Sequence, residues 1–267
     1  MHIPVLIGVG LFMGLSGGLL GIGGSVVMIP ALTLFYGENQ HLYQASAMIC
    51  NFFVAAASLI AHRKAEAIIG KTLRWIIPGA VAGILLGVWL SNLPIFAGPN
   101  SYWLARIFGV FLLYVIVYNF PKFWTRPRTL ESMPSRSGRF NSIVSSLIGF
   151  LTGTSAGLLG IGAGTVCTPL QQVTMKMPIR NAMSNSAATI VSIAWLGALY
   201  KNGTLGQHDI DIMESVRIAV VVMPTAIIGG FLGGHLMHRL PRNLVRALFL
   251  GVCVLAAWKL LTVQPGS

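Results

Sequence analysis

Two glycine-rich runs carry the residue types in this chain that are best suited to bind a ligand. The first reads Gly21-Ile-Gly-Gly-Ser25 and the second reads Gly160-Ile-Gly-Ala-Gly-Thr165. Glycine lets the backbone approach a ligand closely, and a helix that begins after such a run leaves its first N–H groups free at the positive end of its dipole. Oxyanions bind at helix N-termini of this kind, and the hydroxyls of Ser25 and Thr165 add donors. The two runs therefore predict a site for a small anion.

Polar residues also occur in the apolar segment that follows each run. The first of these segments contains Asn51, and the second contains the triplet Ser184-Asn185-Ser186. We expect both to face the substrate, although the triplet could instead form hydrogen bonds between helices. The predicted substrate-binding residues are Gly21, Gly23, Gly24, Ser25, Asn51, Gly160, Gly162, Gly164, Thr165, Ser184, Asn185 and Ser186.

Other chemistries lack the residues they need. A dinucleotide site at Gly21-x-Gly23 would require a preceding strand and an acidic residue about 20 positions later, and neither is present. His235 and His238 are three residues apart without a third metal ligand nearby. Cys167 as a nucleophile would need a base, and no histidine lies in the middle of an apolar segment. We expect no enzyme activity, no metal and no cofactor.

The two glycine runs belong to an internal repeat, which should be sought before any fold is named. Residues 10–30 and 149–169 are identical at eleven of 21 positions. Each copy lies in a long apolar stretch, 3–36 and 141–175, that is too long for one spanning helix of about 20 residues. We expect both stretches to break at their glycine runs. Further helices are predicted at 43–61, 72–92, 102–120, 182–200, 213–234 and 243–262.

Composition places this chain in a membrane. Of its 267 residues, 55% are hydrophobic and 9% are charged, against about a quarter charged in soluble domains. The formal net charge of +12 does not indicate nucleic-acid binding, because the basic residues gather at the ends of apolar segments. The predicted fold is therefore an all-α polytopic membrane protein with seven or eight hydrophobic segments. We expect the lipid bilayer to surround it.

The charge distribution also predicts the topology. We expect a first repeat at 1–120, a basic linker at 121–140 and a second repeat at 141–267. If each broken segment enters and leaves on one side, the two repeats are inverted, and 14 of the 18 Lys and Arg residues lie inside. If each broken segment crosses once, basic loops fall outside. The first arrangement is favoured, with a cytoplasmic linker and both termini outward.

Fourfold glycine spacing outside the runs has a different meaning. Gly10, Gly14 and Gly18 repeat every four residues, as do their counterparts Gly149, Gly153 and Gly157. This small-xxx-small pattern is typical of close helix packing in membranes. It could serve packing inside one chain or a homodimer interface.

The doubled run resembles the sulfite exporter TauE/SafE family of membrane permeases. Ser16-Gly-Gly-Leu-Leu-Gly-Ile-Gly-Gly24 with Pro30, and Ser155-Ala-Gly-Leu-Leu-Gly-Ile-Gly-Ala-Gly164 with Pro169, carry the resemblance, which covers essentially the whole chain. It implies transport of sulfite, organosulfonates or related small sulfur-containing anions across a bacterial-type inner membrane. The second helix of the family often contains Ala-x-Gly-Thr-Ser. Here the first copy, 45–49, is mostly apolar, and the second, 182–186, is polar.

Taken together, the residues predict a secondary permease for a small anion. None of the six Asp and Glu residues falls within a predicted spanning core, so a proton relay has no obvious carrier. An inside-negative potential pushes a monoanion outward with about 2.3 kcal/mol per 100 mV, which favours export. An anion channel using the same N–H groups, or uptake coupled to protons or sodium, remains as an alternative.

Overall fold

The chain forms a bundle of α-helices in a computed structural model that describes residues 2–20, 23–64, 68–120, 141–236 and 242–263. These residues contain no strand. The helices of the first half are α1 (Ile3–Leu20), α2 (Ser25–Tyr36), α3 (Gln40–Lys64), α4 (Gly70–Ser91) and α5 (Tyr102–Asn119). Those of the second half are α6 (Ser142–Leu159), α7 (Gly164–Thr174), α8 (Ile179–Gly203), α9 (Ile212–Leu236) and α10 (Arg242–Leu261). Short 3-10 helices are η1 (Pro94–Phe96), η2 (Gly98–Asn100) and η5 (Leu205–His208).

The predicted all-helical plan is confirmed, including a break in the first apolar stretch of each half. Within the described ranges, five helices are long and apolar enough to cross a bilayer, at Gln40–Ile60, Gly70–Ser91, Ser142–Leu159, Asn181–Gly203 and Ile212–Leu236. Large apolar side chains cover the outside, for example Phe12 at 62% exposure, Val117 at 70% and Leu199 at 68%. Such a surface is stable in lipid and not in water. The protein is an all-α polytopic membrane protein.

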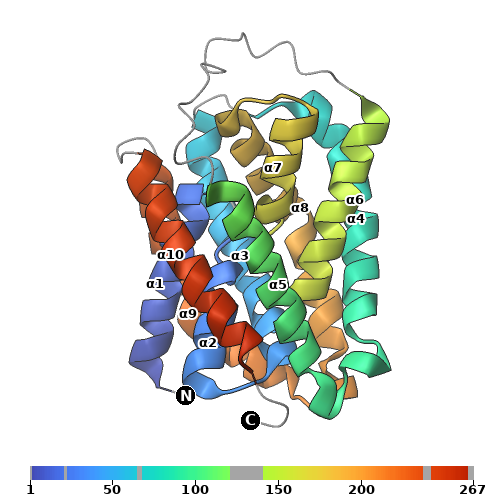
Figure 1. Ribbon diagram of the computed structural model, residues 1–267, viewed down its shortest axis with the longest axis vertical. Helices are drawn as coiled ribbons and strands as arrows, with labels where there is room; N and C mark the ends of the chain where they lie inside the picture. Colours follow the sequence, from blue (N-terminus) through green and yellow to red (C-terminus); the bar gives the residue numbers. More distant parts are fainter. Residues whose placement is uncertain (1, 21–22, 65–67, 121–140, 237–241, 264–267) are drawn as a thin grey trace.

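The two halves begin at opposite ends of the bundle. Figure 1 shows α1 beginning and α10 ending at one end, which we call the first end. At the opposite, second end, α5 ends and α6 begins. From the break, α2 runs back to the first end and α7 runs back to the second end. Each broken pair thus enters and returns at the same end.

Helices α3 and α8 form the centre of the bundle. The share of buried residues is 67% in the α3 span and 72% in the α8 span, against 39–44% in the other three long spans. α3 and α8 pack against each other, and each also contacts the half-helix of its own half, α2 or α7. Side chains on these two helices therefore surround both breaks.

Glycine ladders join the two halves. α4 packs along α6 and α1 packs along α9. A Cβ atom added at Gly83 of α4 would collide with the backbone of Phe150 and Thr154 on α6, and one at Gly153 would collide with Ala80 and Ile84 on α4. The same holds for Gly10, Gly14 and Gly18 of α1 against α9. The fourfold spacing therefore serves packing within the chain, where small residues let the backbones touch.

Replacing Gly83 with valine should force α4 and α6 apart. Overpacking of this kind costs about 1–3 kcal/mol, and each kcal/mol lowers Tm by about 2–4 °C in a chain of this size, so we expect a fall of about 2–12 °C. Thermal unfolding of the purified protein in detergent measures it. The control is Gly251→Val on α10, where an added Cβ meets no atom within 4 Å. Equal Tm values for the two variants would contradict the packing role.

Candidate functional site

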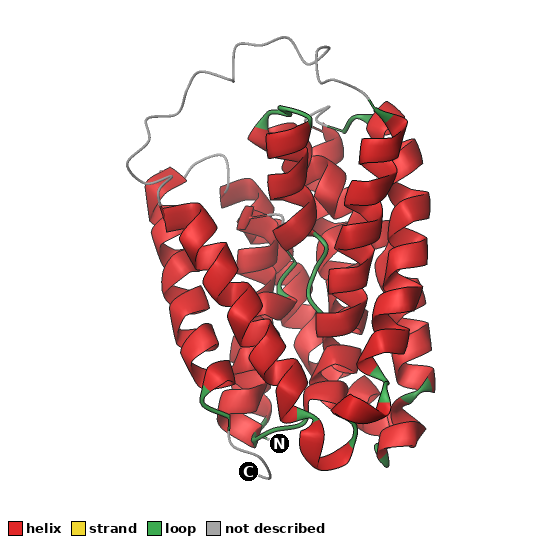
Figure 2. Ribbon diagram, turned by 45° about the vertical axis from the view of Figure 1, so that its right-hand side comes forward, coloured by secondary structure: helices red, strands yellow, loops and turns green. Residues whose placement is uncertain are grey.

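The two helix breaks lie against each other in the middle of the molecule. Figure 2 shows two short loops side by side at the centre of the bundle. Gly23, in the first break, has a φ of 85°, a backbone conformation that L side chains rarely adopt. A Cβ atom at Gly23 would run into the Cα of Gly162 in the second break. Glycine at 23 is therefore required both by its dihedral angle and by the close approach of the two backbones.

Two side chains from the first half tie the breaks together. The Gly162 N–H donates to Ser25 Oγ at 2.8 Å, and Asn51 Nδ2 donates to the same oxygen at 2.9 Å. Asn51 Nδ2 also lies 3.4 Å from the carbonyl oxygen of Gly160, which accepts from it. Ser25 and Asn51 are 0% and 3% exposed. The amide of Asn51 on α3 thus links the start of α2 to the second break.

The half-helices begin without side-chain caps. The residues before them, Gly24 for α2 and Ala163 for α7, make no side-chain cap hydrogen bond. Thr165 Oγ1 donates to the Gly162 carbonyl at 3.1 Å. Within the described residues, no group accepts from the N–H groups of Gly164 and Thr165. Buried N–H groups are nearly always paired, so these two are available to an anion at the positive end of α7.

Acceptor atoms on α3 are also left without partners. Asn51 Oδ1 and Gln44 Oε1 are buried and make no hydrogen bond within the described part of the chain, although Gln44 Nε2 donates to the Leu158 carbonyl at 3.2 Å. Gln44, Met48 and Asn51 follow one another on one face of α3, at spacings of four and three residues. This face of α3 covers the second break.

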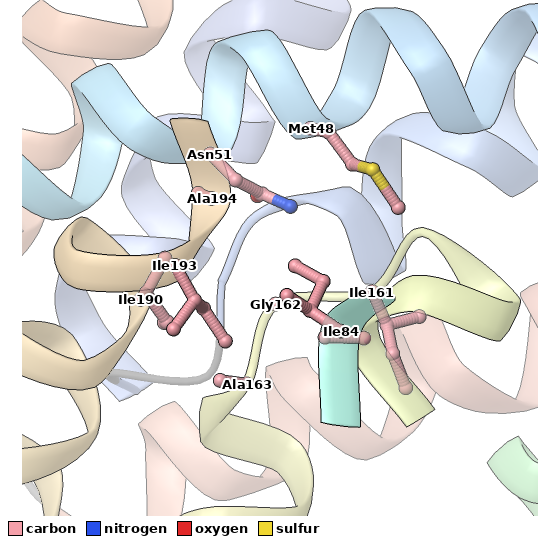
Figure 3. A pocket seen from close by; sticks show the side chains of 10 residues that line it. Met48, Asn51, Ile84, Ile161, Gly162, Ala163, Ile190, Ile193 and Ala194 are labelled. Atoms are coloured by element: carbon pink, nitrogen blue, oxygen red, sulfur yellow. The ribbon is translucent and has the colours of Figure 1, made fainter. Parts of the chain in front are cut away.

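A small cavity opens beside the second break (Figure 3). Its volume is about 10 Å³, and it is lined by Met48, Asn51, Ile84, Ala156, Ile161, Gly162, Ala163, Ile190, Ile193 and Ala194. About one water molecule fits in such a space. A polyatomic anion would need the helices to move apart, so this conformation is closed around the breaks.

Most of the residues predicted to bind substrate at the breaks lie close together in the structure. Gly23, Ser25, Asn51, Gly160 and Gly162 meet through the contacts described above. Gly164 and Thr165 begin α7, and both are buried, while Gly24 packs against Met13 of α1. Gly21 lies outside the described residues.

The triplet lies along α7 instead of at the breaks. Asn185 accepts from the backbone N–H of Ile69 at 2.9 Å and donates to Gln171 Oε1 at 3.2 Å. Ser186 Oγ is 2.8 Å from Thr168 Oγ1. Ser184 is also fully buried on α8. These contacts are hydrogen bonds between helices, the other role that the sequence left open for the triplet.

This polar patch surrounds Cys167, and two of its positions are apolar in the first half. Gln171 Nε2 lies 2.8 Å from Cys167 Sγ, and both residues are fully buried. Their counterparts 139 positions earlier are Met28 and Leu32, which lie in an apolar core. The sequence shows that residues 184–186 are polar, but it does not show that their side chains would bond to α7.

A second polar cluster escaped the sequence reasoning. The side chain of Lys201, at the end of α8, is 0% exposed, and its Nζ lies 2.8 Å from His41 Nδ1, 2.8 Å from Ser91 Oγ and 2.9 Å from Asn92 Oδ1. The His41 ring stacks on the His208 ring, with centroids 3.6 Å apart. Burial and the positive charge of Lys201 lower the pKa of His208. The only sequence signal of Lys201 is a charge directly after the uncharged segment 181–200.

Of the two histidines that are three residues apart, the structure describes His235, near the end of α9. His235 Nδ1 hydrogen-bonds to the Phe231 carbonyl at 3.0 Å. His238 lies outside the described residues. In the part of the chain that the structure describes, no three His, Cys, Asp or Glu side chains gather as a metal site.

Comparison with known proteins extends over nearly the whole chain. It is 24% identical to the probable membrane transporter protein MamO of Magnetospirillum gryphiswaldense over 93% of this chain, which spans less than half (43%) of that protein. It is 23% identical to the probable membrane transporter protein YunE of Bacillus subtilis over 98% of both chains. A probable membrane transporter protein of Xylella fastidiosa is 27% identical over 94% of this chain and 92% of its own. No solved structure matches the chain.

The family described as sulfite exporter TauE/SafE matches residues 6–260. This range includes both helix breaks and every α-helix of the described residues, apart from the first three residues of α1 and the last residue of α10. The chain therefore belongs to the TauE/SafE family of membrane transport proteins.

Proposed function

We propose that the protein is a secondary permease for a small anion, with sulfite or an organosulfonate as the substrate. The observation that carries this proposal is the meeting of two helix breaks at the centre, with unpartnered N–H groups at Gly164 and Thr165. Helix N-termini bind anions, and transporters with inverted repeats hold substrate between half-helices near the bilayer midplane. The family description supplies the sulfur chemistry.

The charges of the bundle suit an anion. The described acidic residues, Glu38, Asp209, Asp211 and Glu214, lie in loops or in the first turn of a helix. No carboxylate among the described residues faces the breaks, so an anion there would meet donors without a repelling charge. The cavity of about 10 Å³ beside the breaks is too small for the anion in this conformation, as expected for a permease in a closed state.

Export is the direction that needs no coupling. An inside-negative potential of 100 mV is worth about 2.3 kcal/mol for one charge, which corresponds to about a 50-fold outward concentration ratio for a monoanion. An Asp or Glu proton carrier at the centre, which coupled uptake would ordinarily use, has no counterpart among the described residues that surround the breaks.

We infer the orientation from the distribution of basic residues. With residues 1–120 and 141–267 as inverted repeats in a cell inner membrane, the first end of the bundle faces outward. The linker at 121–140 and most of the Lys and Arg residues then face the cytoplasm. The linker itself lies outside the described residues.

Single cysteines report this orientation in intact cells. Gln207 in η5 and Lys176 after α7 are both exposed and lie at opposite ends, and the native cysteines are buried. We expect a membrane-impermeant maleimide to label Gln207→Cys in intact cells, and Lys176→Cys only after the membrane is opened. The reverse pattern would invert the proposed topology and remove the argument for export.

Transport should depend on the contact between the breaks. We expect Gly23→Ala to lower the rate of sulfite flux in proteoliposomes at least about tenfold, because its methyl group would lie where Gly162 now packs. The matched control is Gly37→Ala. Gly37 has the same φ of 85°, but an added Cβ there meets no atom within 4 Å, so only the backbone strain is shared.

Flux should be measured under an imposed potential, with both variants reconstituted in equal amounts. Wild-type flux that saturates and follows the potential alone is the expected result. Flux in Gly23→Ala equal to that in Gly37→Ala would remove the breaks as the site. Flux that requires a proton or sodium gradient would replace export with coupled uptake.

A further inference from the structure

Lys201 is a buried cation without an acidic partner. It is fully buried near the C-terminus of α8, at the first end of the bundle. No carboxylate contacts it among the described residues. The titratable groups around it are His41 from α3 and His208 from η5, with Asp209 next to His208. A charge inside a membrane protein is costly and is usually functional.

Hydrogen-bond accounting places one positive charge on Lys201 and its partner His41. Ser91 Oγ donates its hydrogen to the Val88 carbonyl at 2.8 Å, so this oxygen must accept from Lys201. Asn92 Nδ2 donates to Thr204 Oγ1 at 2.9 Å, which leaves Asn92 Oδ1 facing Lys201 as an acceptor.

The third partner leads to the same result. His41 Nε2 lies 2.9 Å from the Phe96 carbonyl oxygen, which can only accept, so the proton is on Nε2. With a neutral His41, Nδ1 accepts from Lys201, and the three acceptors then require the three N–H groups of the ammonium form. With a doubly protonated His41, Nδ1 instead donates to a neutral lysine amine. In both cases Lys201 and His41 together hold one positive charge, and Ser91 and Asn92 are neutral.

The Lys201 cluster lies between the central cavity and the first end of the bundle, on the same three helices that line the cavity. Met48 of α3, Ile84 of α4 and Ala194 of α8 line the cavity. Seven residues further toward the first end on each helix are His41, Ser91 and Lys201. Seven residues are two turns, so each pair shares one helix face and is separated by about 10 Å.

Little polypeptide separates the cavity from the cluster. Gly197 lies between Ala194 and Lys201 on α8, and a Cβ added there would meet the side chains of Ile84 and Met48. Ile84 and Met48, which line the cavity, thus pack against Gly197, between the cavity and Lys201. The cavity, Gly197 and Lys201 therefore follow one another from the breaks toward the first end of the bundle.

We propose that Lys201 is an outer anion subsite, where a small oxyanion on its way to or from the helix breaks binds the ammonium group. This inference rests on the proposed function, because it assigns a second binding site to the same substrate. The anion would replace one or more of the neutral acceptors, and charge-assisted hydrogen bonds are stronger than neutral ones. The substrate supplies the negative charge that the fold lacks.

Lys201→Met removes the charge and keeps the length of the side chain. We expect its half-saturation concentration for sulfite counterflow in proteoliposomes to rise at least about tenfold, and that of Lys201→Arg to change less than about threefold. Lys71→Met, at the opposite end of the bundle, is the matched control and should behave as wild type.

Ser91→Ala should change the half-saturation concentration in the opposite direction. It keeps the charge of Lys201 but removes one acceptor that competes with the anion, so the half-saturation concentration should fall by about threefold. A merely structural role of the cluster predicts lower stability without tighter binding. If Lys201→Met does not fold, Ser91→Ala decides: an unchanged half-saturation concentration overturns the subsite.

A binding measurement separates this proposal from the transport proposal. The Tm of the detergent-purified wild type and of Lys201→Met is compared with and without sulfite. If the wild type moves no sulfur anion, yet sulfite raises its Tm and not that of Lys201→Met, the subsite holds and the transport proposal falls. If Lys201→Met transports sulfite with wild-type half-saturation, the subsite falls and the transport proposal holds.

Discussion

The contact between Gly23 and Gly162 is the constraint on which the rest of the structure depends. A helix broken at membrane depth exposes backbone groups that lipid cannot satisfy, so a break survives only when protein surrounds it. Here each break is covered by the other, by α3 and by α8. The glycine ladders between α1 and α9 and between α4 and α6 hold the two halves close enough for that contact. Close packing thus allows an irregular backbone that could receive an anion.

The two breaks are similar in sequence but contribute different groups. The first half supplies side chains, because Ser25 and Asn51 reach across to the N–H of Gly162 and the carbonyl of Gly160. The second half supplies the backbone groups that these side chains bind. Both half-helices begin with two N–H groups that no described group accepts from, those of Ser25 and Val26 in α2 and those of Gly164 and Thr165 in α7. Outside the breaks the halves diverge further, with a polar patch around Cys167 where the first half has an apolar core.

Much of this organisation could be predicted from the sequence, because it depends on local patterns. Uncharged runs marked the helices, glycine clusters marked the breaks, and fourfold glycine spacing marked the close helix contacts. The remainder depends on which helices become neighbours. Nothing local shows that Asn51 meets Ser25, or that Ser186 of the polar triplet faces Thr168 on α7. Lys201 was the hardest case, since a lysine after an apolar run ordinarily lies in solvent, and its three acceptors come from distant segments.

The central claim is that an anion binds between the breaks, and a heavier analogue of sulfite tests it most directly. Crystals of the protein with ordinary methionine, grown with selenite, would show selenium by its anomalous scattering. The account predicts a selenium peak within hydrogen-bonding reach of the N–H groups of Gly164 and Thr165, next to Asn51. Selenium found only at Lys201 or at exposed basic residues, with none between the breaks, would contradict it.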